Sequence, residues 1–243
     1  MNYVLILGAK SDVGQALAGY YAARGYSLYL AARNSLELEE AVSTLKREYG
    51  VDARTLEFDA LQVDTFQNLY LHLEPKPVGV ITTVGYLGDQ SLAEQDIGEA
   101  QKIINTNFTG LVLFLTMAAQ DFSRRRTGFI VGISSVAGER GRKSNYFYGS
   151  AKAGFTAFLS GLRNRYCNSG IQVLTVQLGF VRTKMTAGMK LPGLLTLSAE
   201  EAAKGIFDAQ QGGRDVAYLS PLWWWVMLLV RSLPERLFKR LDW

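Results

Sequence analysis

The sequence is poor in cysteine and histidine, and both shortages limit the chemistry open to the protein. Its single cysteine, Cys167, excludes an intramolecular disulfide and a thiolate metal cluster, and it is compatible with a reducing compartment. Its single histidine, His72, argues against a histidine-based triad and a histidine-rich metal site, and we expect it on the surface of a helix. We therefore predict a site without a metal ion.

The N-terminus lacks the features of a signal peptide, because it has no basic segment and no long apolar segment. At 243 residues, of which 48% are hydrophobic and 20% charged, the chain suits one domain with a sizeable core. The formal net charge of +4 is too small to select a partner, and the basic cluster at 124–126 suits the end of a helix. We predict a cytoplasmic protein that binds no nucleic acid.

Short apolar segments alternate with amphipathic segments along the chain. We predict strands at Tyr3–Leu7, Ser27–Ala32, Ala53–Phe58, Val78–Val84, Gly128–Ser134, Ile171–Gln177 and Val216–Leu219. We predict helices at Gln15–Arg24, Leu36–Tyr49, Gln62–Leu73, Ala100–Arg124 and Phe147–Asn168. Such alternation indicates an α/β fold: a Rossmann-type, doubly wound, parallel seven-stranded sheet in a single domain.

A glycine-containing turn follows the first predicted strand. The segment Gly8-Ala-Lys-Ser-Asp-Val-Gly14 lies between that strand and the first helix, where a glycine motif binds the pyrophosphate of a dinucleotide. Gly8 permits a tight turn, and Gly14 permits a close approach of backbone or phosphate. The alternative is an ordinary capped strand-to-helix turn. Asp12 can cap the helix in both cases.

Tyr148 and Lys152 lie four residues apart in a predicted helix, and Ser135 precedes the tyrosine by thirteen residues. Residues at this spacing share a helix face, so the ammonium can lie near the phenol and lower its pKa from about 10. Such a phenol can exchange a proton with a substrate oxygen, and a serine hydroxyl can hold the same oxygen. The pattern predicts carbonyl reduction or alcohol oxidation, although the same pair is also common on solvated helix faces.

From Tyr3 to about Thr183, these motifs resemble the short-chain dehydrogenase/reductase family in their order and spacing. The resemblance implies a catalytic group of Asn107, Ser135, Tyr148 and Lys152. It implies cofactor contacts at Gly8, Lys10, Ser11, Asp12, Val13, Gly14, Arg33, Asp59, Ala60, Gly85, Tyr148, Lys152, Val181 and Thr183. Asn107 can equally serve to satisfy backbone groups.

Three positions depart from the family's pattern. Asp12 replaces a glycine, Thr83 replaces the asparagine of an Asn-Ala-Gly motif, and Leu178 replaces a proline. The change at Thr83 is expected to remove a stabilising amide, and the carboxylate of Asp12 needs careful orientation beside a pyrophosphate.

The end of the second predicted strand indicates which nicotinamide cofactor is used. An acidic residue there would bind the ribose 2′-hydroxyl of NAD, but the chain has Arg33 and Asn34, with no carboxylate before Glu37. A guanidinium suits a 2′-phosphate, and Lys10 adds positive potential, so we predict NADP(H). The alternative is a solvated arginine that stacks on adenine. We expect an NADPH-dependent reduction of a ketone or aldehyde.

Residues 221–243 are predicted to form an apolar and basic helical extension of the domain at 1–220. The apolar run at 221–230 contains three consecutive tryptophans, is about half as long as a membrane-spanning helix, and is followed by basic residues. Three roles remain open for it: contact with the inner face of a membrane, self-association or a lid, and core packing.

The substrate pocket is expected to be lined by residues 144–147 and by the substrate loop at 183–197. This loop is apolar, with residues such as Met185 and Met189, and it suits a mobile flap or a helix with its own core. We predict a small-molecule or lipid-linked carbonyl substrate and, from the family resemblance, a homo-oligomer. The alternatives are a non-catalytic NADP-binding sensor and a membrane-surface scaffold.

Overall fold

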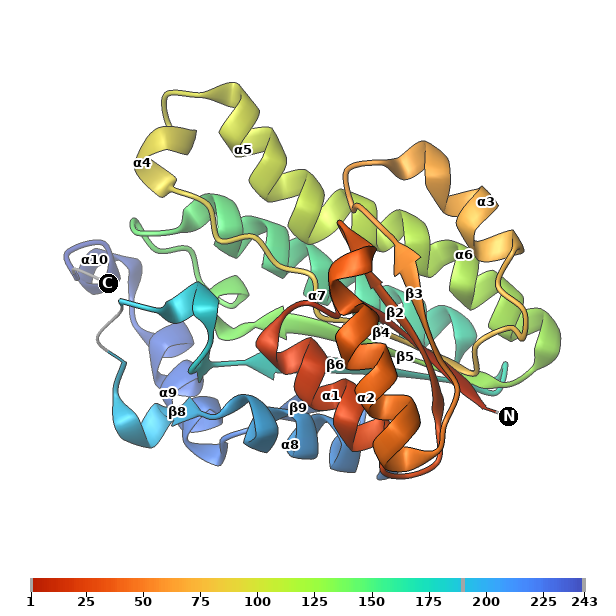
Figure 1. Ribbon diagram of the computed structural model, residues 1–243. Coiled ribbons are helices and arrows are strands. Elements are labelled where there is room, and N and C mark those ends of the chain that lie inside the picture. The colour runs from red at the N-terminus through yellow and green to blue at the C-terminus, as the bar shows by residue number, and fades with distance from the viewer. Residues whose placement is uncertain (1, 189–190, 242–243) are drawn as a thin grey trace.

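The computed structural model describes residues 2–188 and 191–241 and has a parallel seven-stranded sheet at its centre (Figure 1). The strand order is β3-β2-β1-β4-β5-β6-β9, so the chain crosses from one side of β1 to the other between β3 and β4. The strands are β1 Tyr3–Leu7, β2 Ser27–Ala32, β3 Ala53–Glu57, β4 Gly79–Thr82, β5 Gly128–Ser135, β6 Ile171–Leu178 and β9 Val216–Tyr218. The predicted doubly wound α/β fold is confirmed.

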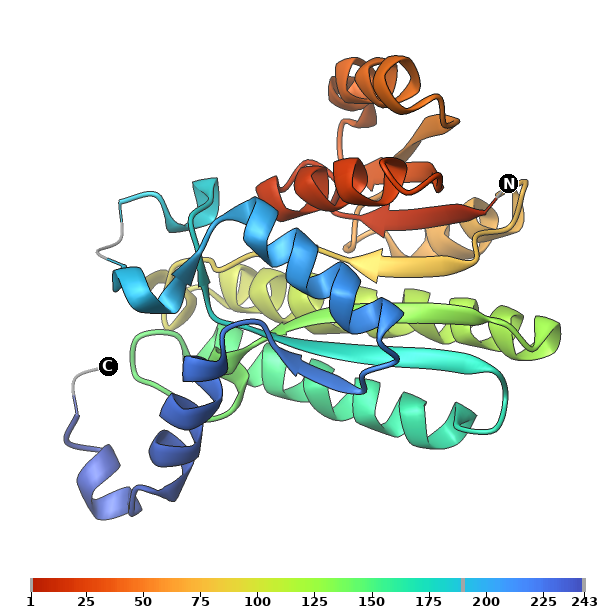
Figure 2. The ribbon, with the colours of Figure 1, turned by 90° about the horizontal axis from the view of Figure 1, so that it is seen from below.

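Helices cover both faces of the sheet, and each face has its own hydrophobic core (Figures 1 and 2). One face carries α1 Asp12–Ala22, α2 Glu39–Tyr49 and α8 Ala199–Gln211, and the other carries α3 Phe66–Leu71, α6 Gly110–Arg125 and α7 Tyr146–Tyr166. Strand β1 supplies both cores, because successive side chains of a strand point to opposite faces. Val4 and Ile6 belong to the first core, and Leu5 and Leu7 belong to the second.

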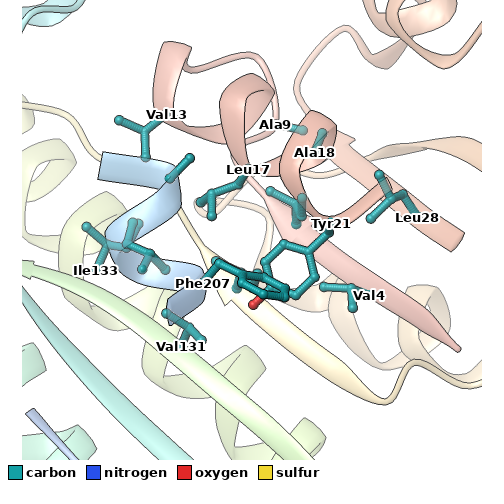
Figure 3. Close-up of a cluster of buried hydrophobic side chains, with 14 of the residues drawn as sticks. Val4, Ala9, Val13, Leu17, Ala18, Tyr21, Leu28, Val131, Ile133 and Phe207 are labelled. Atoms are coloured by element: carbon teal, nitrogen blue, oxygen red, sulfur yellow. The ribbon is translucent and has the colours of Figure 1, made fainter. Parts of the chain in front are cut away.

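The first core is held together partly by aromatic rings from distant parts of the chain (Figure 3). The ring of Tyr21 on α1 meets the ring of Phe207 on α8 edge to face, at a centroid distance of 4.9 Å. This contact packs α8 against α1, the helix that follows the glycine turn. Helix α8 was not among the predicted helices, and neither was the short α4, Gln90–Ala93.

The predicted helix at 100–124 is longer and less regular than expected. It begins with α5, Ile97–Ile104, passes through a π-helical turn at Asn105–Thr109, and continues as α6. This stretch of 29 residues is apolar enough to cross a membrane by length and composition, with 44% of its most apolar window buried in the protein. Its buried side chains pack in the second core, so the fold itself accounts for its apolar character. The predicted helix at 62–73 is likewise reduced to a 3₁₀ turn, Val63–Thr65, followed by α3.

The C-terminal segment forms a helical hairpin beside the carboxyl ends of the strands (Figure 2). It consists of α9, Pro221–Ser232, and α10, Glu235–Phe238. Its buried residues form a third, smaller cluster with Val136: Trp223, Met227, Val230 and Phe238. A small parallel sheet lies next to this cluster. It pairs β7, Phe180–Val181, with β8, Thr196–Leu197, so one strand precedes the substrate loop and the other closes it.

Candidate active site

The glycine turn packs too closely for larger side chains at its two glycines. Gly8 has a φ of +87°, and a Cβ there would lie 2.7 Å from the backbone nitrogen of Val84. A Cβ on Gly14 would lie 2.7 Å from the carbonyl oxygen of Gly8. Ser11 caps α1 by accepting a hydrogen bond from the Gly14 N–H at 3.0 Å. The turn is therefore tightly packed and leads directly into the N-terminus of α1. The free N–H groups at such a helix start are the groups that bind a pyrophosphate.

Thr83 stabilises this turn from the neighbouring strand end. Its hydroxyl lies 2.9 Å from the carbonyl oxygen of Leu7 and 2.8 Å from that of Gly8, and it can donate to either. The threonine that replaces the family's asparagine thus ties the end of β4 to the glycine turn. A hydroxyl therefore bonds to the turn at the position where the family has an amide.

A cavity of about 460 Å³ lies beyond the ends of β1 to β4. Seven of the predicted cofactor residues line it: Gly8, Lys10, Ser11, Arg33, Asp59, Ala60 and Gly85. The ammonium of Lys10 is paired with the Glu37 carboxylate at 2.5 Å, in a partly exposed ion pair. The contribution of Lys10 to the potential of this cavity stays a prediction. Arg33 is exposed at the end of β2, and among the described residues no ion pair holds its guanidinium.

A second cavity, of about 390 Å³, lies beside the first, and the two share Lys10, Ser11, Thr83, Val84 and Gly85. The second cavity is lined by the remaining predicted site residues except Gly14 and Asn107: Asp12, Val13, Ser135, Tyr148, Lys152, Val181 and Thr183. Gly14 lies beneath the turn, in contact with its backbone. The two cavities adjoin each other at the strand ends, where the doubly wound fold predicts a ligand to bind.

Two different elements bring the serine, the tyrosine and the lysine to the second cavity. Ser135 is the last residue of β5, and Tyr148 and Lys152 lie one turn apart on α7. The Lys152 side chain is only 3% exposed, and its ammonium donates to the carbonyl of Ile133 at 3.1 Å. The same ammonium lies 5.8 Å from the centre of the Tyr148 ring. The predicted grouping of these three residues is therefore present in the structure, and their catalytic roles stay predictions.

Burial shifts the pKa values of Tyr148 and Lys152. Desolvation raises the pKa of Tyr148 to about 12, against a smaller opposite effect of a hydrogen bond with Ser135. Desolvation also lowers the pKa of Lys152 to about 8. The lowered pKa expected for Tyr148 is not found in this structure, because the loss of hydration outweighs the opposite effect of the Ser135 hydrogen bond. Tyr148 is therefore a neutral phenol at neutral pH, suited to donating a proton.

Asn107 lies apart from both cavities and is fully buried in the π-helical turn. Its amide nitrogen donates to the carbonyl of Tyr86 at 2.6 Å and to that of Ile103 at 2.8 Å. Its amide oxygen accepts from the Tyr86 N–H at 3.1 Å. The side chain thus satisfies backbone groups, the alternative given above, and it fixes the segment that follows Gly85. A catalytic role for Asn107 stays a prediction.

The two segments predicted to line the substrate pocket do so only in part. Of residues 144–147, Asn145 lines the cavity, and among the described residues of the loop 183–197 only those from Thr183 to Thr186 do. Met189 lies outside the described residues. A contact that was not predicted holds this loop: the Asp12 carboxylate accepts a hydrogen bond from the Lys184 N–H at 2.7 Å.

Comparisons with known proteins agree with this arrangement. The family model described as short chain dehydrogenase matches residues 2–191. An uncharacterized oxidoreductase of Mycobacterium tuberculosis is 35% identical over 98% of this chain and 96% of its own length. Another, from Streptomyces coelicolor, is 33% identical over 98% and 95%.

Among solved structures, a short-chain dehydrogenase from Sphingobium yanoikuyae in complex with NADPH is similar in fold. It is 25% identical, covers 97% of each chain, and has a TM-score of 0.84. The chain therefore belongs to the short-chain dehydrogenase family of oxidoreductases, whose members bind a nicotinamide cofactor.

Proposed function

We propose that the protein is an NADPH-dependent reductase that converts an apolar or lipid-linked ketone or aldehyde into an alcohol. The observation that carries this proposal is the convergence of Ser135, Tyr148 and Lys152 on one cavity beyond the strand ends. The cavity adjoins the space next to the glycine turn, so a cofactor and a substrate have room to meet.

The glycine turn and the first cavity fit a dinucleotide. The backbone at Gly8 and Gly14 leaves no room for a Cβ, and the N-terminus of α1 offers N–H groups to a pyrophosphate. Asp59 and Ala60 also line this cavity, and Val181 and Thr183 line the second cavity. A nicotinamide cofactor held by these residues would supply the hydride that reduces the carbonyl carbon.

Three side chains perform the remaining chemistry. The Ser135 hydroxyl donates a hydrogen bond to the carbonyl oxygen and holds it near Tyr148. The Tyr148 phenol, which burial keeps protonated, transfers its proton to that oxygen as negative charge develops there. The Lys152 ammonium, which the Ile133 carbonyl orients, stabilises the phenolate that remains.

The choice of NADPH over NADH rests on Arg33. This exposed guanidinium lines the first cavity at the end of β2, where the 2′ position of the adenine ribose is recognised in this fold. The nearest acidic side chain in sequence, Glu37, is engaged by Lys10. A planar guanidinium can bind a phosphate with two hydrogen bonds.

The substrate class follows from the walls of the second cavity. Apolar side chains from six different segments line it, namely Leu87, Ile133, Val136, Leu178, Phe180 and Met185. Behind this wall, Trp223 of α9 packs edge to face on Phe180, at a centroid distance of 5.3 Å. An extended apolar substrate would keep these surfaces out of water, so we propose that the alkyl part of the substrate lies here.

The proposal is tested by NADPH oxidation with a series of ketones of increasing alkyl length. We expect kcat/KM to rise with chain length in the wild type and to fall by at least about 100-fold in Tyr148→Phe, since the proton donor is lost. Tyr146→Phe, the same change two residues away on an exposed part of α7, should keep full activity. Arg33→Ala should weaken NADPH binding and leave NADH binding unchanged.

The outcomes separate the alternatives. Equal activity of Tyr148→Phe and the wild type would overturn the mechanism. NADPH binding without turnover of any ketone would favour the sensor, which keeps the fold but performs no reduction.

A further inference from the structure

Helix α9 has two apolar faces, and only one of them is buried. Trp223, Met227 and Val230 form the inner face, and each is at most 4% exposed. On the outer face, Leu222, Trp225 and Leu229 follow one another at helical spacing and are 47%, 63% and 66% exposed. Trp224 and Leu228 widen this outer face, and Leu237 of α10 adds a further exposed apolar side chain.

The inner face is apolar because it packs against the wall of the second cavity, where Trp223 contacts Phe180. The Trp223 indole N–H donates to the carbonyl of Leu195 at 2.9 Å, and its ring fills the space above Gly179. The outer face has no such explanation within the described residues. A single helix therefore connects the cavity wall to an exposed apolar surface.

Basic side chains border this surface. Arg236, Lys239 and Arg240 are exposed on and beside α10. The nearby acidic residue Glu235 is paired with Arg140 at 2.9 Å, so it does not cancel their charge. Tryptophan favours the headgroup region of a bilayer, and lysine and arginine favour anionic lipid.

From this combination we propose that the outer face of α9, together with the basic residues of α10, docks on the surface of an anionic lipid bilayer. A second copy of the chain is a poorer occupant, because the same basic border would be present on both partners and would repel. Docked in this way, the protein lies on the membrane without spanning it, and the cavity wall is one helix thickness from the lipid. The surface does not depend on the proposed reaction, although it would give a lipid-linked carbonyl a short route to Tyr148.

The test is co-flotation of the full-length protein with vesicles of phosphatidylcholine alone or of phosphatidylcholine with phosphatidylglycerol. We expect binding to the anionic vesicles and little to the neutral ones. Trp225→Ser with Leu229→Ser should reduce binding by at least about tenfold. Replacing Arg236, Lys239 and Arg240 with glutamine should reduce it on the order of a hundredfold, at about fivefold for each cation. Leu71→Ser, which removes an exposed leucine from α3, is the matched control and should bind as the wild type does.

Two results would overturn the proposal: no binding of the wild type to anionic vesicles, or undiminished binding of the Trp225→Ser, Leu229→Ser variant. Loss of a dimer in that variant by sedimentation, without vesicle binding by the wild type, would assign the face to self-association instead. Turnover of short soluble ketones should be the same in this variant and the wild type. Vesicle binding without any turnover would leave the docking surface intact and overturn only the proposed reaction.

Discussion

Trp223 is the residue through which α9 is most firmly attached, and its truncation gives a measurable prediction. It is 4% exposed, its indole donates a hydrogen bond to Leu195, and its ring packs on Phe180 and Gly179. Truncation of a buried tryptophan to alanine costs about 3–5 kcal/mol, and the loss of one hydrogen bond about 1 kcal/mol. Because α9 lies at the edge of the fold and can partly collapse, we take about 4 kcal/mol for Trp223→Ala.

The assay is thermal unfolding followed by circular dichroism, with Trp225→Ala on the same helix as the control. In a chain of this length each kcal/mol lowers the melting temperature by about 2–4 °C, so Trp223→Ala should melt about 8–16 °C lower. Trp225→Ala removes the same side chain from an exposed position and should change stability by no more than about 0.5 kcal/mol. Equal melting temperatures for the two variants, with equal amide exchange rates along α9, would refute the packing described here.

Two further predictions concern the site. Because burial lowers the pKa of Lys152 to about 8 and raises that of Tyr148 to about 12, the lysine is charged below about pH 8 and the tyrosine stays protonated well above it. The rate of ketone reduction should therefore fall with the loss of one proton near pH 8, and a rate that is constant to pH 10 would contradict this assignment. Asp12→Ala removes the hydrogen bond to Lys184 and should speed tryptic cleavage after Lys184, with Asp64→Ala as an exposed control. Equal cleavage rates in the two variants would mean that Asp12 does not hold the loop.

Local patterns were sufficient to predict most of the sheet. The strands of the parallel sheet are short apolar runs because they are buried on both faces, and the predicted runs coincide with the observed strands to within about two residues at each end. Because the strands are parallel, their carboxyl ends lie at the same edge of the sheet, and the residues that follow each strand gather there. For this reason the positions of Gly8, Arg33 and Ser135 could be predicted without any knowledge of their contacts.

One missed helix could have been found in the sequence. Ser198 accepts from the Glu201 N–H and Glu201 accepts from the Ser198 N–H, which is the capping box of α8. The Ser-x-x-Glu spacing is a recognised start signal, and apolar residues at helical spacing follow it: Ala199, Ala202, Ala203, Ile206 and Phe207. The π-helical turn at Asn105–Thr109 carries no comparable signal, since it depends on Asn107 bonding to the backbone of Tyr86.

The positions that depart from the family's pattern show most clearly what a sequence leaves open. Asp12 was expected to face a pyrophosphate, yet its carboxylate accepts from a backbone N–H 172 residues away. Thr83 was expected to weaken the site, yet its hydroxyl reaches carbonyls 75 and 76 residues away. Both compensations depend on which distant backbone groups the fold places within 3 Å, and no local propensity contains that information. A substitution inside a motif therefore indicates where the chain differs from its relatives, while the partner that makes the difference tolerable has to be found in the structure.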